Sequence, residues 1–254
     1  MIAMQSDLVS IIMPCHNGAA TIADSIRSVQ NQTFTDWELL VVDDGSTDDS
    51  ARIVTEFATK DSRIFLFHTE KSTGFPATPR NLGISASRGR YLAFLDCDDE
   101  WLSTKLEHQI PLFATRDVAV VFSYYGKMNA DGSFHAEKID SPVFVSYDQL
   151  LNGNVIGNLT GMYDTEKVGK VFQKEIHHED YVMWLEILKK GFSAINTNTV
   201  EAVYRESASS VSGSKLAAFG WTWNIYRHEL KLPFFTSAKY FIRYAVKAVF
   251  KFLK

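Results

Sequence analysis

The first hundred residues alternate between two hydrophobic periodicities. Continuous apolar runs rich in β-branched residues predict buried strands. They occupy residues 8–13, 37–44, 63–67 and 91–95. The segments between them place apolar side chains at helical spacing, as Ile22, Ile26 and Val29 do. This alternation predicts right-handed βαβ units, and therefore an α/β fold with a mostly parallel sheet covered by helices on both faces.

The second half of the chain has a less regular pattern. An apolar run at 118–126 predicts a strand, and the Asp-Gly pair at 131–132 predicts a hairpin turn after it. Residues 179–192 have helical spacing, and Gly191 is suited to end that helix. Neither an internal repeat nor a low-complexity linker divides the chain, so we expect one domain with two subregions.

The C-terminal residues 237–254 change character. Basic side chains recur every fourth residue and cover about a third of a helix circumference. They are Lys239, Arg243, Lys247, Lys251 and Lys254. We expect the apolar residues on the opposite side to be Phe241, Ile242, Ala245, Val246, Val249, Phe252 and Leu253. The pattern is typical of a helix lying in a membrane interface. The alternative is a helix that packs on the protein or on a second subunit.

Composition excludes several classes of protein. The hydrophobic content of 46% in 254 residues is enough to form a sizeable core. A net charge of −4 argues against a general nucleic-acid binder. The two cysteines, Cys15 and Cys97, form no disulfide framework and fit a reducing cytosol. No signal peptide and no membrane-spanning run of about 18 apolar residues is expected.

Three aspartates directly follow the strand predicted at 91–95: Asp96, Asp98 and Asp99. Ligands of open α/β sheets bind beyond the carboxyl ends of the strands, so this is a ligand-binding position. Crowded carboxylates repel unless something positive lies among them. One interpretation is solvated turn acids that cap a helix starting near Ser103. The other is a divalent cation, Mn²⁺ or Mg²⁺, shared with a diphosphate substrate.

Arg80 is a candidate partner for such a diphosphate. It lies on the short helix predicted at 76–87, near the same edge of the sheet, and its guanidinium could bind phosphate in a forked manner. A surface arginine without a specific partner is the alternative. The chain contains neither a P-loop signature nor Gly-x-Gly-x-x-Gly after the first strand, which argues against dinucleotide binding.

Three stretches together resemble family 2 glycosyltransferases of the GT-A fold, in particular bacterial enzymes that build O-antigen, capsule or teichuronic acid. They are "VSIIMPCHNG" through "VVDDGSTDDS" at 9–50, "TPRNLGISASRGRYLAFLDCDDEWL" at 78–102, and "HHEDYVMWLEILKKG" at 177–191. The resemblance covers about residues 8 to 210. It implies a GT-A, Rossmann-like sheet flanked by helices, with a smaller acceptor subregion.

The resemblance implies a nucleotide-sugar site in the first half. Asp43 would accept a hydrogen bond from uracil N3–H, which suggests a UDP-sugar donor. The metal would be held by Asp98 and Asp96, and Asp96 would also face the ribose. A closing loop at 203–216 would bring two more cations to the diphosphate. The other nucleotide-sugar contacts that it implies are Pro14, Cys15, His16, Asn17, Arg80, Arg205 and Lys215.

The resemblance also identifies Glu179-Asp180 with the acidic pair before a helix in this family. Asp180 would be the general base that deprotonates the acceptor hydroxyl, and Glu179 would orient it or the acceptor. Without the resemblance, both would be interpreted as first-turn acids favoured by the helix dipole.

These inferences predict an inverting, metal-dependent transfer of one sugar per encounter to a lipid-linked glycan. Single transfer is expected because the chain lacks the Gln-x-x-Arg-Trp motif of processive synthases. We expect residues 1–105 to bind the nucleotide-sugar and 106–232 to bind the acceptor and supply the base. Residues 233–254 would attach the enzyme peripherally to the cytoplasmic face of the membrane, and a homodimer is possible.

Two other functions stay open at this point. A sugar nucleotidyltransferase would carry a glycine-rich basic loop after the first strand, whereas "PCHNGAA" has no Arg or Lys. A non-catalytic nucleotide-sugar or glycan-binding module would need no base, so the intact Glu179-Asp180 pair argues against it.

Overall fold

The apolar runs of the first hundred residues form four strands in the computed structural model, which describes residues 7–72, 74–129, 132–206 and 215–252. The strands are β1 (Val9–Cys15), β2 (Trp37–Asp43), β3 (Ile64–His68) and β4 (Tyr91–Phe94). β1 pairs in parallel with β2 and β4, and β2 pairs in parallel with β3. The predicted parallel arrangement is therefore confirmed for this half.

The second half adds strands mainly in antiparallel pairs. They are β5 (Glu100–Trp101), β6 (Val118–Met128), β7 (Phe134–Ile139), β8 (Phe144–Val145), β9 (Met162–Asp164) and β10 (Ser193–Arg205). The sheet runs β3-β2-β1-β4-β9-β6-β10-β5, with β7 beside β6 and β8 beside β10. β9 lies antiparallel between β4 and β6, while β6 and β10 are parallel. The sheet is thus mixed, because the reversed β9 interrupts the parallel order.

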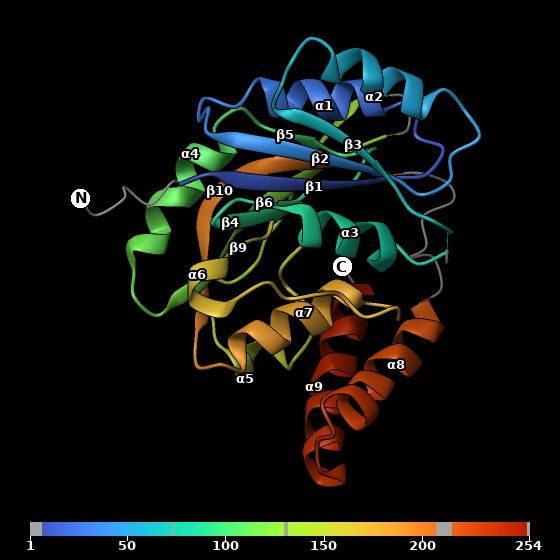
Figure 1. The fold of residues 1–254 in the computed structure, drawn as a ribbon. Helices are drawn as coiled ribbons and strands as arrows, with labels where there is room; N and C mark the ends of the chain where they lie inside the picture. The colour runs from blue at the N-terminus through green and yellow to red at the C-terminus, as the bar shows by residue number, and fades with distance from the viewer. Residues whose placement is uncertain (1–6, 73, 130–131, 207–214, 253–254) are drawn as a thin grey trace.

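Helices cover both faces of this sheet, as expected. They are α1 (Ile22–Gln30), α2 (Ser50–Ala58), α3 (Ala77–Ala86), α4 (Lys105–Gln109), α5 (Tyr147–Leu150), α6 (Thr165–Val168), α7 (Glu179–Leu188), α8 (Lys215–Asn224) and α9 (Phe234–Phe252). Single turns are η1 (Ile110–Ala114), η2 (Asn158–Thr160) and η4 (Ile225–Glu229). Figure 1 shows α1 and α2 on one face, α3 and α7 on the other, and α8 and α9 extending beyond α7.

Side-chain alternation along β1 divides the core into two layers. Ile11 and Met13 pack with Ile26 of α1 on one face of the sheet. Ile12 packs on the other face in a cluster that includes Trp184 of α7. Trp184 is fully buried. Because β1 is buried on both faces, its sequence is a continuous apolar run rather than an alternating one.

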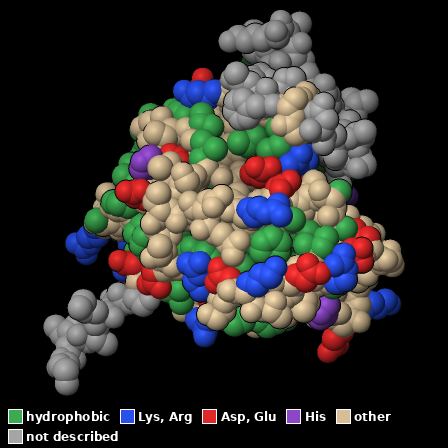
Figure 2. All heavy atoms as spheres, turned by 90° about the horizontal axis from the view of Figure 1, so that it is seen from above, with side chains coloured by type: hydrophobic (Ala, Val, Ile, Leu, Met, Phe, Trp, Pro, Cys, Tyr) green, Lys and Arg blue, Asp and Glu red, His purple; other side chains and the backbone are tan. Residues whose placement is uncertain are grey.

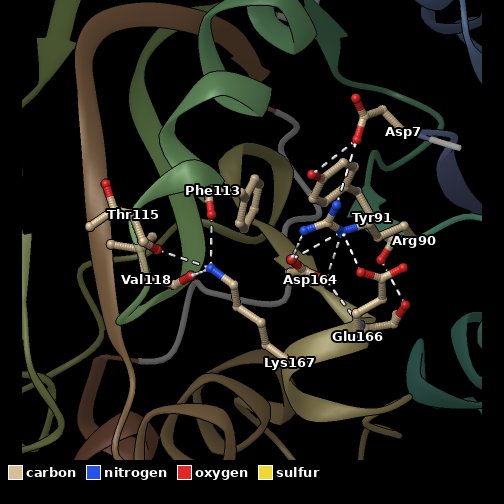
Figure 3. A network of polar contacts seen from close by, with 10 residues as sticks. Asp7, Arg90, Tyr91, Phe113, Thr115, Val118, Asp164, Glu166 and Lys167 are labelled. Carbon is tan, nitrogen blue, oxygen red and sulfur yellow. Dashed lines mark hydrogen bonds and ion pairs between the residues drawn. The ribbon is translucent and has the colours of Figure 1, made fainter. Parts of the chain in front are cut away.

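Figure 3 shows how the second half is fastened at the amino-terminal edge of β4. Arg90 precedes β4 and forms ion pairs with Asp164 at 2.8 Å and with Glu166 at 3.1 Å. Lys167 of α6 donates three hydrogen bonds, at 2.7–3.0 Å, to the backbone carbonyls of Phe113, Thr115 and Val118. These contacts hold β9 and α6 against β4 and β6, at the edge opposite the carboxyl ends of the parallel strands.

The outer face over α1 and α2 carries both signs of charge. Arg27 pairs with Asp24 in α1, and Arg52 pairs with Asp49 and Glu56 at the start of α2 and within it. Figure 2 shows acidic and basic side chains interspersed over this view of the molecule. Such exposed pairs contribute little to stability and mainly keep the face soluble.

The hairpin predicted after β6 is confirmed by the antiparallel pairing of β6 with β7. The turn uses Gly132 at φ 83, which an L-residue rarely adopts, although Asp131 lies outside the described residues. The helix predicted from residue 179 is also confirmed, and Gly191 at φ 96 follows its end.

The C-terminal helix α9 presents three faces rather than two. Ser237 and Tyr240 are buried against the protein, and Phe241 packs on Trp223 with ring centroids 5.3 Å apart. Phe241, expected on the apolar side of the helix, therefore packs on α8, as the alternative of a helix packed on the protein predicts. The exposed apolar stripe consists of Phe235, Ile242 and Val246. Lys239, Arg243 and Lys247 form an exposed basic row beside it.

The remaining residues of the predicted basic and apolar sides of α9 have side chains outside the described set. They are Val249, Lys251, Phe252, Leu253 and Lys254. No helix in the described part of the chain combines the length and apolar composition needed to cross a membrane.

Candidate active site

A cavity of about 520 Å³ lies at the carboxyl ends of β1, β2 and β4. Parallel strands end at the same edge of a sheet, so their loops converge there. Six residues predicted from the sequence line this cavity, and several others from the neighbouring loops join them. The lining consists of Pro14, Cys15, His16, Asp44, Ser72, Gly74, Phe75, Pro76, Pro79, Arg80, Asp96, Cys97, Asp98 and Tyr204.

The loop after β1 is fixed to the loop after β2. His16 Nδ1 lies 2.8 Å from the Asp44 carbonyl oxygen. Asn17 adopts φ 53, and its side-chain oxygen accepts a hydrogen bond from the Thr47 backbone N–H at 2.8 Å. The backbone N–H of Asn17 donates to the Ser46 hydroxyl at 2.9 Å. Asn17 thus shapes the loop through its own contacts, and Asn tolerates the left-handed conformation that the turn requires.

Asp43 ends β2 as a buried carboxylate with an unsatisfied oxygen. Its Oδ2 lies 3.4 Å from His68 Nδ1, while Oδ1 is buried without a hydrogen-bond partner among the described residues. A buried acceptor left unpaired is costly, so its pairing with a ligand N–H is favourable. The adjacent Asp44 instead accepts hydrogen bonds from the hydroxyls of Thr69 and Ser72, both at 2.7 Å, and so fixes the loop after β3.

The aspartates after β4 do not cap the next helix. α4 begins at Lys105 and its N-cap, Thr104, has no side-chain cap. Asp99 is 1% exposed and accepts a hydrogen bond from the Arg205 backbone N–H at 2.9 Å. Burial, reinforced by the neighbouring Asp96 and Asp98, raises the pKa of Asp99 well above its usual range. The interpretation as solvated capping acids is therefore wrong, because Asp99 ties this loop to the end of β10.

Arg205 also contacts the acidic loop, which is the loop after β4 that contains Asp96, Asp98 and Asp99. Its Nε donates to the Asp98 carbonyl oxygen at 3.0 Å, and its guanidinium pairs with Glu100 at 2.8 Å. The residue is 9% exposed, so its charge is committed to these partners in the structure. Lys215 begins α8, but its side chain and residues 207–214 of the expected closing loop lie outside the described set.

Asp98, like Asp96, is half-buried. Burial raises its pKa, and the nearby Asp96 acts in the same direction. The two arginines that attract it, Arg80 and Arg205, form their ion pairs with other acids. In the described part of the chain, no cluster of three or more His, Cys, Asp or Glu residues could enclose a metal ion. Two carboxylates that need oxygens from a substrate fit Mg²⁺ or Mn²⁺ better than a closed protein cage.

Cys15 and Cys97 both lie in this cavity. Hydrogen bonding between the two thiols lowers the pKa of Cys15 to about 7, although burial opposes the shift. Cys15 is 2% exposed, so its thiol is shielded from solvent.

Arg80 joins the acidic loop to the acids of α7. It is 4% exposed and forms ion pairs with Asp96 at 2.7 Å and with Glu179 at 2.6 Å. Burial acts to lower the pKa of the guanidinium, but these two carboxylates outweigh it and raise the pKa. Its Nε has no hydrogen-bond partner among the described residues. Asp96 and Glu179, which are far apart in the sequence, therefore share the Arg80 guanidinium.

Asp180 occupies the first turn of α7, directly after the shared Glu179. His178 at φ 62 precedes the helix and turns the chain into it. Asp180 is half-buried, and Asn154 donates to its Oδ2 at 3.0 Å. Burial raises the pKa of Asp180 to about 7, and the Glu179 carboxylate acts in the same direction. A carboxylate with a pKa near 7 can accept a proton at neutral pH.

Several residues of the site were not predicted from the sequence. Gln173 is buried and contacts Arg80 at 3.3 Å, and it is held in turn by Asn81. Asn154 reaches Asp180 from the loop after α5. None of these positions belongs to a periodic pattern or a motif, so the sequence carried no signal for them.

The fold and the paired acidic groups define a glycosyltransferase, and the chain belongs to glycosyl transferase family 2, whose model matches residues 10–171. TuaG of Bacillus subtilis (strain 168), named for teichuronic acid biosynthesis, is 38% identical over 245 residues, which is 96% of this chain and 97% of TuaG. The UDP-Glc:alpha-D-GlcNAc-diphosphoundecaprenol beta-1,3-glucosyltransferase WfgD of Escherichia coli is 39% identical, covering 87% of this chain and 86% of WfgD. The resemblance to the surface-polysaccharide members of the family is thereby confirmed.

Solved structures share the fold at low sequence identity. S. aureus TarS 1–349 in complex with UDP-GlcNAc has a TM-score of 0.73 and 16% identity, over 93% of this chain and 71% of that one. The mannosyltransferase PcManGT from Pyrobaculum calidifontis, in complex with GDP-Man and Mn²⁺, has a TM-score of 0.64 and 18% identity, over 90% of this chain and 64% of that one. The expected GT-A fold is confirmed.

Proposed function

We propose that this protein transfers one sugar from a UDP-sugar, with inversion at C1, to a hydroxyl of a lipid-linked glycan in bacterial surface polysaccharide synthesis. The observation that carries the proposal is the buried Arg80 between Asp96 and Glu179. It places the acids of the donor cavity and the acids of α7 in one site. The names of WfgD and TuaG support the donor, the acceptor class and the pathway.

The donor would lie in the cavity at the carboxyl ends of the parallel strands. Asp43 has a buried oxygen free to accept the uracil N3–H, and His16 borders the cavity where the nucleoside would lie. Arg80 lines the same cavity, and its buried Nε has no hydrogen-bond partner among the described residues, so a phosphate oxygen would be a suitable partner. Each of these groups would gain a partner when the UDP-sugar binds.

Asp98 and Asp96 would hold Mn²⁺ or Mg²⁺ together with oxygens of the donor diphosphate. Their crowding and the raised pKa of Asp98 fit this role, because a divalent cation would relieve the cost of burying adjacent negative charges. When bound, such a cation stabilises negative charge on the departing diphosphate. Asp99 and Arg205 would keep the loop in position through their backbone and side-chain contacts.

Asp180 would act as the general base. The acceptor oxygen would attack C1 of the donor sugar while its proton passes to Asp180. The bond between C1 and the β-phosphate oxygen breaks, and its electron pair leaves with UDP. Attack from the face opposite the leaving group inverts C1. Asn154 would keep Asp180 oriented, and Glu179, held by Arg80, would add the negative charge that keeps the Asp180 pKa high.

The substitution Asp180→Asn tests this assignment. We expect transfer from UDP-sugars with Mn²⁺ to fall by about 10²–10⁴-fold, the usual contribution of a general base, while UDP affinity stays unchanged. Asp117→Asn is a matched control, because Asp117 is exposed and contacts Ser193 through its backbone carbonyl. Transfer by Asp180→Asn at the wild-type rate would refute the assignment.

The helix α9 would attach the enzyme to the membrane that holds the acceptor. Its exposed apolar stripe adjoins a row of exposed basic residues, which is the arrangement of interfacial helices. Anionic lipids would strengthen the contact through the basic row.

A further inference from the structure

A second cavity, of about 590 Å³, lies between α9 and the loop that follows α5. Four segments line it: Tyr125 of β6, residues 138–141 at and after the end of β7, the loop 152–157, and α9 through Tyr244, Lys247 and Ala248. It shares no lining residue with the cavity that contains Asp96 and Asp98. The molecule therefore has a second compartment, in the half of the chain that follows the donor-binding strands.

This second cavity adjoins the proposed base. Asn154 lines the cavity and also donates to Asp180 Oδ2 at 3.0 Å. Helix α5, which precedes this loop, is held against α7 because the Tyr181 hydroxyl donates to the Leu150 carbonyl oxygen at 2.9 Å. The Asn154 side chain would thus lie between a molecule in the cavity and the Asp180 carboxylate, which is proposed to take the acceptor proton.

The chemistry of the lining suits a sugar attached to phosphate. Lys138 of β7 and Lys247 of α9 bring two exposed cations to it from separate segments. Lys138 pairs with Asp140 at 2.8 Å, and Asp140 is the acid among the lining residues. The net charge of the lining is therefore positive. Lysine binds phosphate as a compact point charge, and tyrosine and asparagine provide hydrogen bonds for hydroxyl groups.

The position of α9 connects this cavity to the membrane. Lys247 belongs both to the basic row of α9 and to the cavity lining. The helix is held in place by the Tyr240 hydroxyl, which donates to Asp148 at 3.2 Å. It also packs closely on the loop, since a Cβ atom added at Gly153 would lie 3.2 Å from the Tyr244 ring. A lipid anchored along the exposed face of α9 would therefore bring its head group to the cavity.

We infer that this second cavity binds the glycosyl-diphosphate head group of a lipid-linked acceptor, with Lys138 and Lys247 at the diphosphate and Asn154 at the sugar. The inference rests on the proposed function for the role of Asp180 and for the lipid-linked acceptor. It adds the residues that select an acceptor carrying a diphosphate.

The experiment compares two water-soluble acceptors in the absence of membranes: N-acetylglucosamine diphosphate on a short alkyl chain, and the alkyl glycoside of the same sugar without phosphate. We expect Lys247→Ala and Lys138→Ala each to raise KM for the diphosphate acceptor about tenfold, the loss of one charge-assisted contact, with kcat within twofold. KM for the alkyl glycoside should not change. Lys189→Ala is the control, because Lys189 is an exposed lysine at the end of α7.

An unchanged KM for the diphosphate acceptor in both lysine variants would overturn the inference. An equal rise in KM for both acceptors would also overturn it, because the lysines would then act on the fold and not on the phosphates. If the wild type binds UDP but transfers no sugar, the proposed function fails and calorimetric binding of the diphosphate acceptor decides the inference. Tenfold weaker binding to Lys247→Ala than to the wild type would support it. Equal binding to both proteins, or no detectable binding to the wild type, would refute it.

Discussion

Arg80 and Asp180 determine the electrostatics of the site at the scale of single residues. A buried guanidinium is stable only where carboxylates compensate for its lost hydration, and Asp96 and Glu179 do so at 2.7 and 2.6 Å. Those two acids are thereby held close together, and Glu179 in turn raises the pKa of its neighbour Asp180. Burial is the main cause of the raised Asp180 pKa, the Glu179 carboxylate adds to it, and Arg80 acts in the opposite direction.

The raised pKa of Asp180 predicts a stability cost that depends on pH. Its pKa of about 7 in the folded state exceeds the usual unfolded value of about 3.9. The folded protein therefore holds this proton more tightly, and its stability falls as pH rises from about 4 to 7. The cost above pH 7 is on the order of 2–4 kcal/mol, at about 1.4 kcal/mol per pKa unit.

Asp180→Asn should remove that cost. We expect its Tm at pH 8 to exceed that of the wild type by about 5 °C or more, because about 1 kcal/mol shifts Tm by about 2–4 °C in a domain of this size. The difference should shrink towards pH 4. Thermal unfolding of both proteins from pH 4 to 8 measures it, and parallel curves for the two proteins would show that Asp180 titrates normally.

Single residues were predictable where a motif located them. Asp96 and Asp98 come after β4 and line the cavity at the carboxyl ends of the parallel strands, as their place after a predicted strand indicated, and Asp43 is the last residue of β2. The sequence could not show that Arg80 is shared by Asp96 and Glu179. That arrangement depends on how α3 and α7 pack on the same face of the sheet.

At the scale of elements, the strands with continuous apolar runs were predictable and the irregular ones were not. β10 escaped prediction because its sequence contains the polar stretch 196–199, and its register with β6 shifts between Asn196 and Val200. Asn198 has φ 63 at that bulge. Such a bulge breaks the two-residue alternation by which a strand is recognised. β9, with three residues, is too short to form a pattern.

The proposed membrane contact of α9 can be tested by substitutions at its exposed residues. Removing α9 would expose the buried Tyr240, so substitutions on the outer stripe are the better test. We expect Ile242→Asn combined with Val246→Asn to weaken binding to vesicles with anionic lipids at least tenfold, because each side chain would lose about 1.5 kcal/mol or more of apolar burial. Sedimentation with the vesicles measures the bound fraction.

The control for this measurement is Phe172→Asn. Phe172 is 49% exposed, comparable with Val246 at 47%, but it does not belong to α9. Vesicle binding by the Phe172 variant should equal that of the wild type. Equal binding by all three proteins would show that α9 does not contact the membrane.

At the scale of the whole molecule, one sheet carries the elements that form both cavities. The parallel strands β1, β2 and β4 end at the donor cavity, and the reversed β9 links them to the half that carries α7 and α9. The second cavity lies beside Asp180 and against α9. The assignment of donor binding to the first half of the chain and acceptor binding to the second stays a prediction. The second cavity could not be predicted from the sequence, because four segments distant in the chain line it.

A crystal structure with Mn²⁺ and UDP tests the central proposal most directly. We predict an anomalous manganese peak within coordination distance of Asp98, bridging to the diphosphate. The uracil N3–H should donate to Asp43 Oδ1, which has no hydrogen-bond partner in the part of the chain that the structure describes. Manganese bound at a different place, or UDP bound away from the carboxyl ends of β1, β2 and β4, would contradict it.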